Sequence, residues 1–141
     1  MMRGNRRKGS VLIEFAGSLI LLATLCTGIF RIAYAFYAYG NLVGAVRAGA
    51  RYASLAYRGR PAADPEFARS VRDLVVYGDI RPAPGAKPMV PGLANANVDL
   101  TMRPDSATVA VRGFELDALF MKIQLDGRPT VTFPLGRESA Q

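Results

Sequence analysis

The chain has 141 residues, half of them hydrophobic, and a formal net charge of +7 at pH 7. It contains one cysteine, Cys26, and no histidine, which excludes an intrachain disulfide, a zinc site of cysteine and histidine ligands, and histidine-dependent catalysis. Four of the 18 cations precede Gly9, and the other 14 are nearly balanced by 11 anions, so the chain is not a uniformly basic nucleic-acid binder. The length predicts one small domain beside any membrane segment.

A run of 20 mostly apolar residues, 11–30, follows the N-terminal cations and holds one charge, Glu14. As a helix rising about 1.5 Å per residue, the run would be about 30 Å long, which is enough to cross a hydrocarbon core. Residues 34–39 then supply three tyrosines and a phenylalanine, a composition typical of a membrane interface. We therefore expect a single-pass protein with a cytoplasmic N-terminus and an extracytoplasmic remainder.

Three hypotheses compete for this segment. A signal peptide would be cut at the Ala-x-Ala site of residues 33–35, but the apolar run exceeds the usual length of about 7–15 residues and contains Glu14. A retained anchor fits the length, but it leaves a glutamate that costs about 3 kcal/mol deep in lipid, or less if its side chain snorkels. The third hypothesis combines the cations, Gly9 and Glu14 into one processing signal.

Residues 8–15, Lys-Gly-Ser-Val-Leu-Ile-Glu-Phe, resemble the cleavage site of type IV prepilins. In that family a basic leader ends in glycine, a prepilin peptidase cuts after it, and glutamate is the fifth mature residue. A cut between Gly9 and Ser10 puts Glu14 at that position, and the following Phe15 resembles the Tad (tight adherence, Flp-type) branch. The leader charges would be those of Arg6, Arg7 and Lys8.

Residues 28–54 resemble the signature of TadE-like pseudopilins, an aromatic-rich stretch followed by Ala-Val-Arg-x-Gly-Ala-Arg-Tyr-Ala. The resemblance covers about residues 6–57, and the motif residues are Arg47, Gly49, Ala50, Arg51 and Tyr52. It implies a minor pseudopilin or assembly protein of a Tad-type pilus or secretion system, in the TadE or the TadF role, with no catalytic, metal or cofactor site. Minor status is indicated by the C-terminal domain, since major Flp subunits are much shorter.

The resemblance also implies partners and a location. The partners would be the prepilin peptidase, other Tad pilins and pseudopilins, inner-membrane platform proteins and membrane lipid, with no nucleic acid. The chain would span the bacterial inner membrane once and place its C-terminal domain in the periplasm. Cleavage would leave an α-amine on Ser10, positively charged near neutral pH. The resemblance implies that Glu14 pairs with such an amine, on its own chain or a neighbour, and so favours one axial register.

The helix is expected to continue beyond the membrane, from Val11 to Tyr57, because the chain has no proline there and is rich in helix formers. Small residues recur every four positions in two offset sets, a spacing that lets another backbone approach closely. The partner of that face would be the chain's own C-terminal domain, another subunit, or both over different lengths. The candidate packing residues are Gly40, Gly44, Ala45, Ala48 and Gly49.

The remainder predicts a small α+β domain. Asp64 as a cap and Pro65 in a first turn predict a helix over 65–77 that ends at Gly78. Four prolines and two glycines predict a long loop over 79–97. Alternating apolar residues then predict a hairpin over 98–111 and a last strand over 131–135, whereas 114–125 is ambiguous and has a spacing that suits a short helix.

The expected fold is therefore α+β: a long N-terminal pilin-like helix, a second short helix and a small antiparallel sheet. Its parts would be a leader (1–9), a transmembrane helix (10–30), an extracytoplasmic continuation (31–58) and a domain (59–141). The chain lacks a phosphate-binding loop and its carboxylates lack metal-loop spacing, so no enzyme is expected. The alternative function is an uncleaved, single-pass membrane anchor that carries a periplasmic binding domain or an atypical hydrolase.

Overall fold

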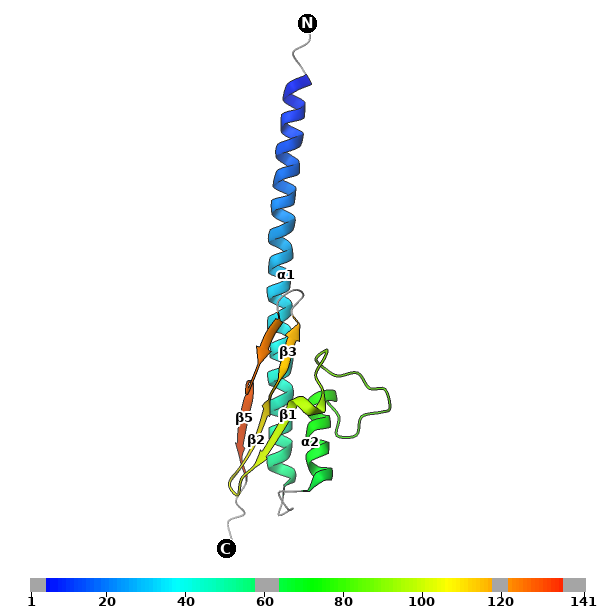
Figure 1. Ribbon diagram of the computed structural model, residues 1–141, viewed down its shortest axis with the longest axis vertical. Helices are drawn as coiled ribbons and strands as arrows, with labels where there is room; N and C mark the ends of the chain where they lie inside the picture. The colour runs from blue at the N-terminus through cyan, green and yellow to red at the C-terminus, as the bar shows by residue number, and fades with distance from the viewer. Residues whose placement is uncertain (1–4, 58–63, 118–121, 136–141) are drawn as a thin grey trace. The chain divides into compact units, whose positions relative to one another are not determined.

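The computed structural model describes residues 5–57, 64–117 and 122–135 (Figure 1). A long apolar N-terminal helix, a second short helix and small antiparallel sheets confirm the predicted α+β, pilin-like fold class. The chain divides into two compact units, Met1–Tyr34 and Ala35–Gln141. In chain order the elements are α1 (Asn5–Ala56), α2 (Pro65–Tyr77), the 3-10 helix η1 (Asn95–Asn97), β1 (Val98–Met102), β2 (Ser106–Val111), β3 (Phe114–Asp117), β4 (Lys122–Leu125) and β5 (Thr130–Pro134).

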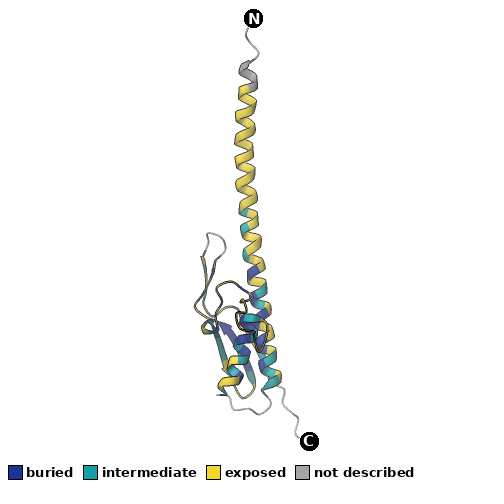
Figure 2. Cartoon of the chain, turned by 90° about the vertical axis from the view of Figure 1, so that its right-hand side faces the viewer, coloured by how far each residue is buried: buried dark blue, intermediate teal, exposed yellow. Residues whose placement is uncertain are grey.

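Helix α1 starts earlier than the predicted Val11 and stops just before the predicted Tyr57. Among the described residues it is the helix long and apolar enough to cross a membrane, with a mean hydropathy of 1.9 over its best 18-residue window. The large apolar side chains of the first unit are exposed (Figure 2). Thr27 donates its hydroxyl hydrogen to the carbonyl of Ala23 at 2.7 Å, so this polar group is satisfied within the helix.

Helix α2 has the two ends that the sequence predicted. Asp64 caps the N-terminus, because its Oδ1 accepts from the N–H groups of Glu66 at 3.0 Å and Phe67 at 3.3 Å. Gly78 adopts a left-handed conformation, with φ of 77°, and its N–H donates to the carbonyl of Leu74 at 2.9 Å. These caps fix where the helix begins and where the loop of residues 79–94 leaves it.

The predicted hairpin and last strand form one antiparallel sheet in the order β1-β2-β5. Its register places Val109 of the central strand opposite Leu100 of β1 and Val131 of β5. Val109 is fully buried, so the apolar side of the sheet faces the core. The turn between β1 and β2 is closed by a hydrogen bond of 2.8 Å from the N–H of Arg103 to the carbonyl of Ser106.

The short helix expected within 114–125 is wrong: β3 and β4 pair there as a two-stranded antiparallel sheet. Phe114 and Leu116 are buried while Glu115 between them is exposed, which is the period of a strand. Lys122 of β4 is paired with Asp117 in the register, and its Nζ lies 3.6 Å from Glu115 Oε2. The helical pattern also relied on positions 119 and 120, which lie outside the described residues.

One hydrophobic core unites the second unit, drawn in dark blue in Figure 2. The C-terminal half of α1, the inner face of α2 and the sheet all contribute to it, so both helices pack against the sheet through this core. Its members are Ala38, Leu42, Ala45, Val46, Ala50, Ala53, Phe67, Val71, Val75, Val76, Val90, Leu93, Val98, Ala107, Val109, Val111, Phe114 and Leu116.

Candidate functional site

The prepilin-like motif lies entirely on α1. Gly9, Ser10, Glu14 and Phe15 are exposed, and nothing lies within 4 Å of the place where a side chain on Gly9 would begin. Ser10 and Glu14 are four residues apart, so they share one side of the helix. Because glycine weakens a helix by about 0.5–1 kcal/mol relative to alanine, Gly9 is a point at which the helix is locally less stable.

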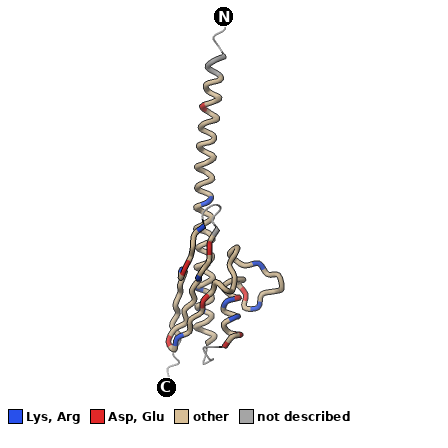
Figure 3. Tube along the Cα trace, in the orientation of Figure 1, with Lys and Arg blue, Asp and Glu red and all other residues tan. Residues whose placement is uncertain are grey.

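Charges are sparse along the upper part of α1 (Figure 3). Between Ser10 and Phe30 the sequence holds no charged residue besides Glu14. The backbone of the three leader cations belongs to α1, while their side chains lie outside the described part of the structure. Glu14 is therefore the one charged residue of this apolar stretch of the sequence.

The two offset sets of small residues have different surroundings. Ala45 and Gly49 are buried against the domain, and a Cβ on Gly49 would overlap the Cγ2 methyl of Val75 on α2. In contrast, Gly40 and Gly44 are exposed, with nothing within 4 Å of an added Cβ, and Ala48 is exposed too. The set with Ala45 and Gly49 therefore packs α1 against its own domain. The other set, Gly40, Gly44 and Ala48, forms a narrow exposed strip of small residues, the open strip.

The residues of the TadE-like motif divide in the same way. Ala50 is fully buried and Tyr52 stacks on Phe67 of α2, with ring centroids 6.2 Å apart and an interplanar angle of 25°. Arg47 and Arg51 are exposed and lie one turn apart on the helix. The motif thus packs α1 onto α2 on one side and presents two cations on the other.

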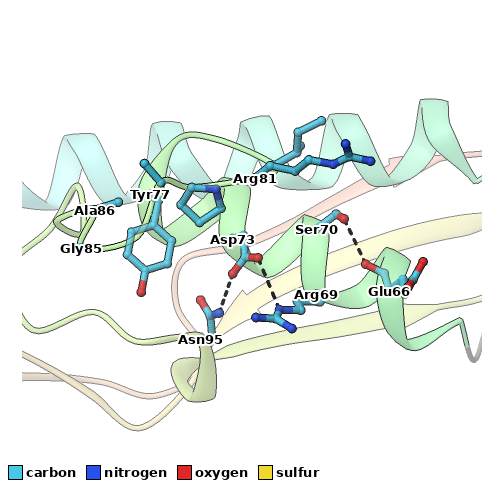
Figure 4. Close-up of a pocket in the computed structure, with 12 residues that line it drawn as sticks. Glu66, Arg69, Ser70, Asp73, Tyr77, Arg81, Gly85, Ala86 and Asn95 are labelled. Carbon is cyan, nitrogen blue, oxygen red and sulfur yellow. Dashed lines mark hydrogen bonds and ion pairs between the residues drawn. The ribbon is translucent and has the colours of Figure 1, made fainter.

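The structure contains a polar cluster around Asp73 that was not predicted from the sequence (Figure 4). The Asp73 side chain lies between those of Asn95 and Arg69, and the residue is only 8% exposed. Asn95 Nδ2 donates to Asp73 Oδ1 at 2.6 Å, and Arg69 Nε lies 3.8 Å from Oδ2. The cluster fastens η1 to α2, and nothing in the local sequence distinguishes Asp73 from the surface acids.

Two cavities flank this cluster. The first, of about 510 Å³, lies between the outer side of α2 and the start of the 79–94 loop, and includes Tyr77 and Arg81 (Figure 4). The second, of about 560 Å³, lies where α2, η1 and β1 meet. Within the described part of the chain, no group of three or more acidic, cysteine or histidine residues could hold a metal ion.

A comparison with protein families identifies the N-terminal segment. The model of TadE-like proteins matches residues 9–51, which include Gly9, Glu14 and the motif up to Arg51. No curated protein and no solved structure matches the chain. TadE-like proteins form a family of pilus structure and assembly, not known for enzymatic activity, and an N-terminal apolar helix is consistent with their membrane anchoring. The chain therefore carries a TadE-like segment at residues 9–51, which makes it a protein associated with Tad pili.

Proposed function

We propose that this protein is a minor pseudopilin of a Tad-type pilus or secretion system, cut by a prepilin peptidase between Gly9 and Ser10. The observation that carries the proposal is the place of the TadE-like segment, which begins at Gly9 itself. The exposure of the motif also supports it, since a membrane protease needs access to the backbone. The mature chain would begin with Ser10 and act through packing, not through catalysis.

In this proposal the chain has four functional parts. Residues 1–9 would be the leader, 10–30 would span the inner membrane, 31–58 would contain the rest of the helix, and 59–141 would form a periplasmic domain. The basic leader would keep the N-terminus in the cytoplasm, because positive charge is retained on that side. The length and the hydropathy of 1.9 support a span within α1.

Assembly would use Glu14 and the open strip of small residues. Glu14 would pair with the Ser10 amine of its own or a neighbouring chain, because a carboxylate in lipid is stabilised by an opposite charge. The strip formed by Gly40, Gly44 and Ala48 would receive the helix of another pilin, pseudopilin or platform protein. Its exposure supports this use, because the chain's own domain packs on the other set of small residues.

The mature N-terminus tests the processing step directly. The full chain would be expressed with and without a prepilin peptidase, and its first residue identified by mass spectrometry. We expect Ser10 only when the peptidase is present, and loss of cleavage on Gly9→Val. A matched Gly17→Val change, at an equally uncrowded glycine in α1, should leave cleavage intact.

Two outcomes would overturn this function. A chain that still begins at Met1 in the presence of the peptidase would be an uncleaved anchor, the alternative function considered for this sequence. A chain that begins at Phe36 would have been cut by signal peptidase after the Ala-x-Ala site. Either result would remove the basis for pairing between Ser10 and Glu14.

A further inference from the structure

The second cavity is lined mainly by polar and charged residues, unlike a simple packing defect between apolar side chains. It is formed by Arg72 of α2, Asn95 and Ala96 of η1, Val98 and Asp99 of β1, and Arg112 after β2. The proposed pilin functions use none of these residues. Polar groups outnumber apolar ones in this lining, so the cavity suits a ligand that forms hydrogen bonds.

Two buried atoms in the lining have opposite hydrogen-bonding character and no hydrogen-bond partner among the described residues: Arg72 Nε, a donor, and Asn95 Oδ1, an acceptor. The orientation of the Asn95 amide is fixed, because its Nδ2 donates to the buried carboxylate of Asp73 at 2.6 Å. Reversing the amide would place its oxygen against that carboxylate. A ligand that satisfies both atoms needs one acceptor for Arg72 Nε and one donor for Asn95 Oδ1. A peptide bond carries these two groups.

The edge of β1 adjoins the same cavity. In the described sheet β1 pairs with β2 on one side only. The bond from the N–H of Arg103 to the carbonyl of Ser106 sets the alternation of an antiparallel ladder. By that alternation, the N–H and C=O groups of Leu100 and Met102 point away from β2. Such an edge can pair with an added extended segment, which gains main-chain hydrogen bonds.

The charge of the cavity indicates the side chain that the segment should carry. Arg112 is already neutralised by Asp99, with Nε and Oδ2 3.1 Å apart. Arg72 contributes the remaining positive charge of the lining. A glutamate or aspartate on the incoming segment would complement it, and the guanidinium geometry suits a carboxylate.

We propose that this cavity binds an acidic, extended peptide segment of a partner protein along the edge of β1. One main-chain carbonyl of the segment accepts from Arg72 Nε, and an N–H of the segment donates to Asn95 Oδ1. A free carboxylate satisfies the arginine but not the asparagine oxygen, because an ionised carboxylate carries no hydrogen-bond donor. The site thus discriminates between a peptide and a free carboxylate.

A small peptide can test the site in the full chain. The protein, in detergent micelles and with ¹⁵N-labelled arginine and asparagine, would be titrated with acetyl-Ala-Glu-Ala-N-methylamide and followed by NMR. We expect the Nε–H signal of Arg72 and the side-chain amide signal of Asn95 to shift together and to saturate. The same peptide with methylated main-chain nitrogens should bind at least about tenfold more weakly, because it cannot donate to Asn95.

Variants separate the arginine geometry from its charge. Arg72→Lys keeps the charge but loses the Nε–H, so the affinity for the peptide should fall about tenfold or more. Arg81→Lys, the same change at an exposed arginine outside this cavity, should leave the affinity within about twofold. A Gly9→Val chain that escapes cleavage should bind the peptide as the wild type does, so this site and the processing proposal can fail separately.

Three results would overturn the proposal. Equal binding of the N-methylated peptide would show that no N–H is donated to the protein. Equal shifts with acetate alone would show an anion site. Absence of any shift at millimolar peptide would show that the cavity holds only water.

Discussion

At the residue scale, Gly49 shows how one missing side chain sets a helix contact. A Cβ at this position would overlap the Cγ2 methyl of Val75, and Val71 O lies 3.7 Å away. Valine is stiff at χ1, so the methyl cannot swing aside freely. The close packing of α1 on α2 therefore depends on glycine here, whereas Gly44, five residues earlier on the open strip, meets nothing within 4 Å.

Replacing Gly49 with alanine should destabilise the domain by about 1–3 kcal/mol, because the helices must move apart. The matched Gly44→Ala change should be neutral or stabilising by up to about 1 kcal/mol, since alanine favours helix and has space there. Urea unfolding of the full chain in detergent, followed by tyrosine fluorescence, measures both. Equal stability of the two variants would contradict the close contact between Gly49 and Val75.

Asp73 is the other residue whose surroundings set its role. Asp73→Ala leaves the part-buried Nδ2 of Asn95 without its acceptor and should destabilise the domain by about 1–3 kcal/mol. Arg69→Ala removes only a surface partner, 82% exposed and 3.8 Å away, so its effect should stay well below 1 kcal/mol. The same unfolding measurement compares them. A larger loss of stability with Arg69→Ala than with Asp73→Ala would mean that the ion pair with Arg69, and not the Asn95 amide, is the main interaction of the Asp73 carboxylate.

At the scale of elements, the helices, the hairpin of β1 and β2 and the last strand β5 could be predicted from local sequence patterns, whereas β3 and β4 could not. Both caps of α2 involve residues within four positions of the helix ends, so the sequence shows them directly. In 114–125, apolar residues satisfy a helical and a strand period at once, and pairing across the β3–β4 sheet decides. Asp73 and Asn95 are 22 residues apart, so their bond depends on the path of the whole loop between them. The motif residues from Gly9 to Phe15 are neighbours in the sequence, so they could be identified without knowledge of the fold.

The N-terminal cap of α2 gives a prediction at this scale. Asp64→Ala removes the acceptor of two backbone N–H groups and should destabilise the domain by about 1 kcal/mol. Asp64→Asn should restore most of that loss, because asparagine caps nearly as well. Far-UV circular dichroism during thermal unfolding would follow both variants. No difference between alanine and asparagine would show that α2 is held by its apolar face alone.

At the scale of the whole molecule, the TadE-like segment spans the boundary between the two compact units. It begins at Gly9 in the first unit and ends at Arg51 in the second. It therefore includes both the prepilin-like motif and the helix that carries the domain's core. The core residues of the domain all lie in the second unit, so a substitution near the N-terminus can test the proposed assembly without changing that core.

Glu14→Leu separates assembly from anchoring. In lipid, leucine is more favourable than an unpaired glutamate by about 3 kcal/mol, so the variant should anchor at least as well as the wild type. If Glu14 pairs with the Ser10 amine of a neighbour, the variant should nevertheless lose most pilus assembly or secretion, with cleavage intact. Ser18→Leu, one turn further along α1 and equally exposed, adds the same side chain without removing a charge and should assemble normally. Immunoblots of membrane fractions would measure anchoring, mass spectrometry of the mature N-terminus would measure cleavage, and immunoblots of sheared surface fractions would measure assembly. Normal assembly of Glu14→Leu would show that the glutamate is a tolerated charge with no role in assembly.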